Sequence, residues 1–126
     1  MVTAVAYGAC LNGHPSVAKE YKDSTAVVVA TVLAERLVPS SDNDFYDGTI
    51  YQIRVDRRFR GDLGEKAEIF SENSSGRFPM KVGSRYLLFI YTANSRMQVD
   101  YCGNSGLLVN RTKEVRELER LANAKR

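Results

Sequence analysis

The stretch GTIYQIRVDRRFRGDLGEKAEIF, residues 48–70, decides the fold class of this chain. Within it, Tyr51, Ile53 and Val55 alternate with polar residues, which is the period-two pattern of a half-buried strand. Two glycines then bracket a turn, and residues 67–70 read as a second, shorter strand. The stretch therefore predicts consecutive strands joined by a tight connection.

The flanking sequence extends the same pattern in both directions. Residues 25–33 (TAVVVATVL) are β-branched and almost wholly apolar, which predicts a central strand covered on both faces. Residues 39–48 are turn-forming and predict a loop at the end of the sheet. Downstream, residues 83–91 and 97–101 alternate around a turn at 94–95, as in a hairpin.

Two helices are expected outside these strands. Residues 15–22 begin with proline, whose ring presets the first helical turn, and predict a short helix. Thr112 can cap a C-terminal helix over residues 113–124, in which Val115, Leu118 and Leu121 form an apolar stripe. A further apolar segment at 107–109 gives five or six strands in all, without a βαβ rhythm. This order is typical of a small sandwich or a closed Greek-key barrel.

Composition limits the classes of function. The chain has 126 residues, of which 44% are hydrophobic and 26% charged, so it is most simply one globular domain rather than a disordered chain. Its formal net charge of +3 is too small to indicate a nucleic-acid or acidic-membrane partner. No apolar run approaches the ~20 residues that span a bilayer.

The N-terminus and the cysteines bear on location. Ala4-Val5-Ala6 has the small-x-small pattern of a signal-peptidase site, so residues 1–9 are interpreted as a tail or a signal remnant. Cys10 and Cys102 lie 92 positions apart, a spacing that no short metal or redox motif uses. They could bridge the first and last strands of the domain, or they could be two buried free thiols.

Residues 48–70 and 78–92 together resemble the netrin-like domain, and residues 14–34 fit its opening helix and first strand. That domain is the OB-fold barrel of the tissue inhibitors of metalloproteinases and their bacterial relatives. The resemblance implies a mainly β, five- or six-stranded Greek-key OB-fold barrel over residues 10–126, with a short N-terminal helix and a C-terminal helix. It also implies a disulfide between Cys10 and Cys102.

The sequence departs from the family at a second bridge. Relatives usually open with Cys-x-Cys, whereas this chain has Gly8-Ala9-Cys10, and the partner cysteine is missing near residues 75–77. Family inhibitors chelate the zinc of their target with the amine and carbonyl of the first cysteine. Because glycine occupies that position here, zinc-chelating inhibition is not expected.

The resemblance implies a non-enzymatic, exported protein-interaction module, secreted or periplasmic, that acts as a monomer without cofactor or metal. Its expected partner is another protein, with a protease among the candidates, rather than a nucleic acid or a membrane. In the relatives, the equivalent edge of the barrel is the contact surface. The residues that this assigns to partner contact are Gly8, Ala9, Cys10, Leu11, Ser75, Arg77, Gly103 and Asn104.

One alternative is an OB fold that binds single-stranded nucleic acid or oligosaccharide. Arg54, Arg57, Arg58 and Arg60 form a basic patch near aromatic residues, as in single-strand-binding grooves. However, Tyr51 falls on the apolar face of its strand, which favours a place in the core.

Three other local motifs give only weak indications of a catalytic or metal site. Residues 103–106 (GNSG) resemble a serine-protease nucleophile loop, but the only histidine, His14, precedes the first helix, and a turn is expected instead. His14 with Cys10 would supply only half of a metal site. Acidic residues in the 42–47 loop could hold calcium, although no EF-hand spacing follows and a solvated loop is expected.

Overall fold

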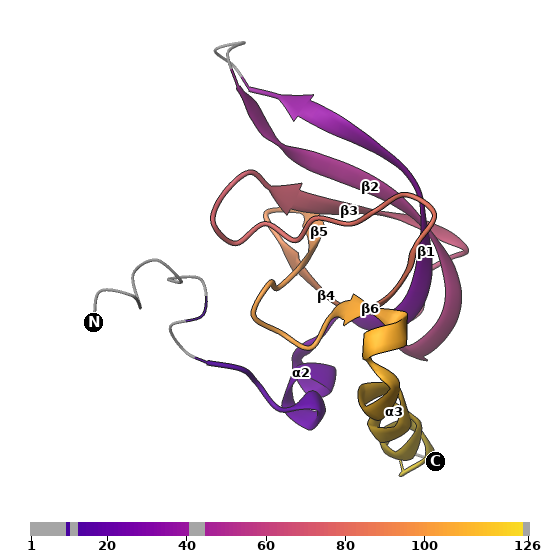
Figure 1. Cartoon of the computed structure of the whole chain (residues 1–126). Coiled ribbons are helices and arrows are strands. Elements are labelled where there is room, and N and C mark those ends of the chain that lie inside the picture. The colour runs from indigo at the N-terminus through magenta and orange to yellow at the C-terminus, as the bar shows by residue number, and fades with distance from the viewer. Residues whose placement is uncertain (1–9, 11–12, 41–44, 125–126) are drawn as a thin grey trace.

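The protein is described by a computed structural model that covers residue 10, residues 13–40 and residues 45–124. It is mainly β, as predicted, with one antiparallel sheet and two α-helices (Figure 1). The strands are β1 (Ala26–Pro39), β2 (Tyr46–Arg60), β3 (Lys66–Glu72), β4 (Arg85–Ala93), β5 (Arg96–Val99) and β6 (Gly106–Leu107). The helices are α2 (Val17–Asp23), the short 3-10 helix η2 (Leu108–Asn110) and α3 (Thr112–Ala124).

The sheet curls until its two edges meet. Its strand order is β3-β2-β1-β4-β5, with β6 paired to β4. Although β3 and β5 lie at opposite ends of this order, they contact one another (Figure 1). The Arg96 guanidinium lies 4.1 Å from the centre of the Phe70 ring. No hydrogen-bonded ladder joins β3 to β5 among the described strands. The sheet is therefore strongly curved but not closed by backbone hydrogen bonds.

The curvature of the β1–β2 pair has a local cause. Its pairing with β2 shifts register at four points, between Val27 and Val28, Val29 and Ala30, Val32 and Ala34, and Val38 and Pro39. Three of the shifts place the extra residue on β2 and one places it on β1, and such bulges bend the paired strands and increase their twist. β1 can thus pair with β2 along its whole length and with β4 only from Ala26 to Thr31.

The main core fills the inside of the curled sheet. Every second residue of β1 from Ala26 to Val32 points into it, and Tyr51, Ile53 and Val55 of β2 do the same, as their alternation predicted. The hydroxyl of Tyr51 accepts a hydrogen bond from the backbone N–H of Met80 at 3.1 Å, so its one polar atom is satisfied in the core. Tyr51 is therefore a core residue rather than an exposed aromatic platform.

A second core lies between the sheet and the helices. Val27 and Val29 of β1 join Leu87 and Phe89 of β4 on this side, which confirms that the central strand is covered on both faces. Leu118 of α3 is completely buried among them, and Val115 and Leu121 pack at its sides. The apolar stripe predicted for the C-terminal helix is confirmed.

Several predicted boundaries were wrong. The predicted loop at 39–48 is shorter, because β1 runs to Pro39 and β2 begins at Tyr46, with residues 41–44 outside the described ranges. A hairpin can extend past the core because paired strands satisfy each other's backbone groups even where their side chains are exposed. Tyr101 lies beyond β5 and is 54% exposed, whereas the alternation had placed it in the strand.

Two further corrections concern the C-terminal part. The apolar segment 107–109 contributes only the last residue of β6 and then turns into η2, with Val109 81% exposed. Thr112 is the first residue of α3 rather than its cap, and the backbone N–H of Val115 bonds to the carbonyl of Arg111. The 3-10 turn lets the chain leave the sheet and enter α3 within a few residues.

Candidate functional site

A disulfide joins the start of the described chain to the turn after β5. The Cys10 and Cys102 sulfur atoms are 1.94 Å apart and their Cα atoms 5.3 Å apart, a separation typical of disulfides. The predicted pairing is confirmed, and the alternative of two free thiols is wrong. Cys102 is buried and Cys10 is half-buried, so the bond is partly shielded from solvent.

A carboxylate on α2 holds the residues that follow this disulfide. Glu20 Oε1 accepts hydrogen bonds from the backbone N–H of Asn104 at 2.6 Å and from its side-chain Nδ2 at 2.9 Å. The same Asn104 Nδ2 also donates to the carbonyl of Pro15 at 3.0 Å. We call this arrangement of Glu20, Asn104 and the Pro15 carbonyl the Glu20 latch, because it ties the first helix to residues 102–106.

The environment of Glu20 opposes its charge. Burial raises the pKa of its carboxyl above the ordinary value, and the nearby charge of Asp100 acts in the same direction. The hydrogen bonds from Asn104 and the charge of His14 lower that pKa and offset only part of the effect. Gly103 lies against the Glu20 carboxylate so closely that a Cβ atom there would collide with it.

The turn after the latch is braced by buried hydrogen bonds. The Ser105 hydroxyl accepts from the backbone N–H of Phe89 at 2.8 Å, and Ser105 is only 4% exposed. Arg111 donates from Nε to the carbonyl of Asn104 at 2.9 Å and from a terminal nitrogen to the carbonyl of Ser105 at 3.1 Å. Residues 103–106 are therefore a braced turn, and the Ser105 hydroxyl serves to satisfy a backbone donor of β4.

A hollow of about 170 Å³ opens beside this turn, between the end of β3, β4 and the residues after β5. Its lining residues are Phe70, Ser71, Glu72, Ser74, Gly76, Tyr91, Gln98, Val99, Asp100 and Tyr101. Tyr91 is 37% exposed. Burial raises the pKa of its hydroxyl, and the negative charges of Asp100 and Glu72 raise it further. The hollow thus combines tyrosine rings with carboxylates.

The structure brings part of the predicted contact set to this end of the molecule. Cys10, Gly103 and Asn104 are joined through the disulfide and the Glu20 latch. Ser75 and Arg77 are exposed in the loop after β3, whose Ser74 and Gly76 line the hollow. The predictions for Gly8, Ala9 and Leu11 fall outside the described residues.

Other residues of this end had no signal in the sequence. Glu20 occupies an ordinary polar position on a short helix, and Asp100 is one acid in a turn. Tyr91 continued an alternating strand and was indistinguishable there from a surface residue. Only the tertiary structure places it in one hollow with Asp100 and Tyr101.

The basic patch of β2 is held by contacts within the chain. Arg60 donates to the carbonyl of Ser24 at 3.0 Å and stacks on the buried Tyr21 ring, while Arg57 pairs with Glu119 at 3.0 Å. Arg58 donates to the carbonyl of Leu63 at 2.6 Å. The aromatic rings beside the patch, Tyr21 and Phe59, are 7% and 8% exposed, so they offer no platform for bases.

Asp56 neutralises the remaining end of the patch. It accepts hydrogen bonds from Thr31 at 2.7 Å and Arg54 at 2.9 Å, and Arg85 lies 3.4 Å away. Burial opposes its charge, but these hydrogen bonds and the two arginine charges outweigh that effect and lower the pKa of Asp56. Each of the four arginines of the patch thus contacts another group of the chain.

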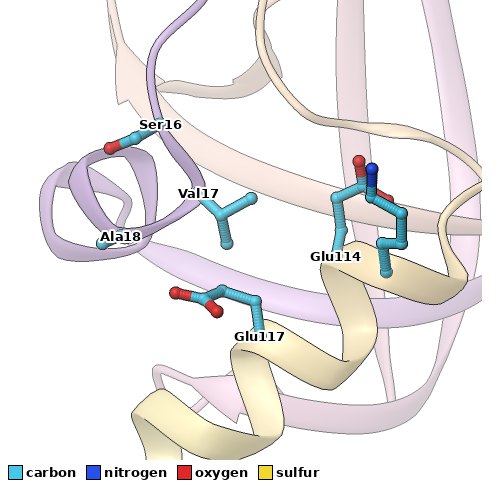
Figure 2. Close-up of a pocket in the computed structure, with 6 residues that line it drawn as sticks. Ser16, Val17, Ala18, Glu114 and Glu117 are labelled. Atoms are coloured by element: carbon cyan, nitrogen blue, oxygen red, sulfur yellow. The ribbon is translucent and has the colours of Figure 1, made fainter.

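The remaining candidate sites are a groove between the two helices and the metal sites considered from the sequence. A groove of about 320 Å³ separates α2 from α3, and Figure 2 shows Glu117 reaching from α3 toward Val17 across it. His14 is exposed, and within the described part of the chain no three His, Cys, Asp or Glu side chains are grouped to hold a metal. The calcium loop falls largely on residues 41–44, outside that part.

No protein-family model and no curated protein matches the sequence of this chain. None of the helices seen in the described residues has the length and apolar character that crossing a bilayer requires.

Proposed function

We propose that this chain is a netrin-like OB-fold domain that is exported and acts without catalysis by binding another protein. The order β3-β2-β1-β4-β5, with β3 contacting β5, supports a partly open Greek-key barrel of the OB type. Two helices at one end of the curled sheet fit the opening and closing helices that the resemblance implies. Zinc chelation is not part of the proposal, because the family position for it is Gly8.

The disulfide between Cys10 and Cys102 carries this proposal. Disulfides persist in oxidising compartments, which supports a secreted or periplasmic location. The bond also anchors the chain near Cys10 beside the braced turn, on the side of the molecule where the loop with Ser75 and Arg77 meets the hollow. We call this region, formed by Cys10, residues 73–77 and residues 100–104, the disulfide end.

Site-specific photo-cross-linking in the native host tests partner binding. A benzoylphenylalanine at Ser75 or Arg77, both exposed at the disulfide end, is expected to give the same discrete cross-linked protein. The matched control places the probe at Lys113, which is exposed on α3. The cross-linked protein must then bind the purified domain in solution.

Two results would contradict the proposal. One is cross-linking from Ser75 and Arg77 no stronger or more specific than from Lys113. The other is mass spectrometry of the protein from its host showing reduced Cys10 and Cys102 and a location in the reducing cytosol.

A second candidate function rests on a groove on another face. Ile50, Phe70 and Arg96 line a hollow of about 230 Å³ where β2 and β3 meet the β4–β5 turn. The stacked Phe70 ring and Arg96 guanidinium resemble the platforms on which OB folds stack bases or sugars. If this face binds single strands, fluorescence anisotropy with a labelled oligothymidine should detect binding that weakens steeply with salt and with Phe70→Ala.

A further inference from the structure

The hollow at the disulfide end has an unbalanced charge. Glu72 and Asp100 line it, and no lysine or arginine does so among the described residues. The chain as a whole has a net charge of +3, so the charge that lines this hollow is opposite in sign to the net charge of the chain. Two arginines beside the hollow are engaged by residues of its rim, since Arg77 donates to the carbonyl of Ser74 and Arg96 stacks on Phe70.

A second hollow, of about 250 Å³, continues the first one on the α2 side. It shares Tyr91 and Asp100 with the first hollow and adds Glu20 and Asp23. Asp23 is paired with Lys19 at 2.8 Å, and Glu20 is occupied by the latch. Asp100 Oδ1 accepts from the backbone N–H of Cys102, yet neither Asp100 nor Glu72 forms an ion pair within the described ranges.

Aromatic rings complete the arrangement. Tyr91 and Tyr101, 37% and 54% exposed, line the hollow together with the two carboxylates. The electron-rich face of a tyrosine attracts a cation, and a carboxylate accepts charge-assisted hydrogen bonds from an ammonium or guanidinium group. Carboxylates and tyrosine rings around a hollow of side-chain size therefore match the chemistry of one basic side chain.

We propose that this hollow receives a lysine or arginine side chain of the partner protein. This inference rests on the proposed function and deepens it, because it states which residue type the partner must present. The side chain would enter between Tyr91 and Tyr101 and meet Glu72 and Asp100. Binding there would be favoured by low salt, because the charges lie at the surface.

Short peptides test the inference without the partner. The probes are Ac-Gly-Arg-Gly-NH2 and Ac-Gly-Lys-Gly-NH2, added to the ¹⁵N-labelled full chain with its disulfide intact. We expect saturable amide shifts in residues 72–76 and 98–101. The peptide with neutral citrulline in place of arginine should bind at least about tenfold more weakly, because a charge-assisted interaction is lost.

The variants remove charge while keeping shape. Glu72→Gln combined with Asp100→Asn should weaken binding of the cationic peptides at least about tenfold. The Asp100→Asn change keeps a side-chain oxygen that can still accept from the Cys102 N–H. The control, Asp62→Asn with Glu65→Gln, removes the same charge from an exposed turn and should leave binding unchanged. The spectra themselves report whether each variant is folded.

Three results would overturn the inference: no saturable shifts, equal binding of the citrulline peptide, or full binding by the Glu72/Asp100 variant. The proposed function fails separately. If the peptides bind but no protein is cross-linked at Ser75 or Arg77, the proposal of a protein partner is wrong. The hollow is then still a binding site for a cationic side chain. If a partner is cross-linked while the peptides do not bind, only the inference about its basic residue is wrong.

Discussion

At the scale of single residues, Glu20 shows how one carboxylate can organise a surface. Its oxygen accepts both hydrogen bonds from Asn104, across 84 positions of sequence, and Gly103 leaves room for it. Burial disfavours the charged form of Glu20, and the hydrogen bonds from Asn104 offset only part of that effect. Glu20 therefore links the position of α2 beside residues 102–106 to its own protonation state.

The pH dependence of stability follows from the raised pKa of Glu20. A carboxyl whose pKa is higher in the folded protein stabilises the fold most below its unfolded pKa. That contribution is lost as the pH rises through the folded pKa. Glu20→Gln keeps an acceptor for Asn104 and removes this loss. The free energy of unfolding of the variant relative to wild type should therefore increase as the pH rises above about 4, the ordinary range of a glutamate pKa. Urea unfolding at several pH values measures this difference.

Two further variants serve as comparisons for the Glu20→Gln measurement. Glu65→Gln removes a carboxylate from an exposed turn and should show a smaller change with pH. Glu20→Ala removes the acceptor itself and should lower the free energy of unfolding by about 1–3 kcal/mol, because donors of Asn104 lose their partner. A Glu20→Gln difference that stays constant across the pH range would show that the burial of Glu20 does not destabilise its charge.

At the scale of elements, β1 separates two cores. From Ala26 to Val32 its residues alternate between the inside of the curled sheet and the helix side, so this half of the strand is apolar on both faces. α3 closes the second core with Leu118, which packs against side chains of β1 and β4. The helix is thus held by tertiary packing of its apolar face more than by its own propensity.

Truncating Leu118 tests the contribution of α3. Leu118→Ala should lower the free energy of unfolding by about 2–5 kcal/mol, since it removes a fully buried side chain and leaves a cavity. The matched control is Leu37→Ala, at a leucine that is 60% exposed on β1, with an expected change within about 0.5 kcal/mol. Similar losses for the two variants in chemical denaturation would mean that α3 is not packed as described.

At the scale of the whole molecule, the disulfide closes nearly the entire domain. Cys10 and Cys102 enclose every strand from β1 to β5, together with α2. The bond limits the conformations of the unfolded chain over that whole length, so its effect belongs to the molecule rather than to one element.

Removing the bond should have a large effect. Cys10→Ala with Cys102→Ala is expected to lower the free energy of unfolding by roughly 4–5 kcal/mol, the loop-entropy value for a link of this length. Adding a reductant should destabilise the wild type by a similar amount and leave the double variant unchanged, which is the control. Equal denaturation midpoints for the oxidised wild type and the double variant would contradict this account.

The pattern of residues was sufficient for the strands, the two helices and the apolar stripe at Leu118. Local alternation reports which side chains face a core, and that information is present within each segment. The turn at Asn94 and Ser95 was predicted in the same way, and both residues have positive φ angles of 54° and 64°, as a tight hairpin requires. The ends of β1 and β2 were missed because backbone pairing continues where the side chains are no longer buried.

The amino-acid sequence by itself determined that this chain is a mainly β domain with two covering helices. It also limited the cysteines to a bridge or two free thiols. Only the tertiary structure decided that Glu20 would meet Asn104, that the arginines of β2 would be occupied by the fold, and that Tyr91, Glu72 and Asp100 would share one hollow. The physical reason is the distance in sequence between the residues involved. Periodicity shows within one segment which face is buried, whereas a site brings together side chains from distant segments and forms only when the sheet has curled.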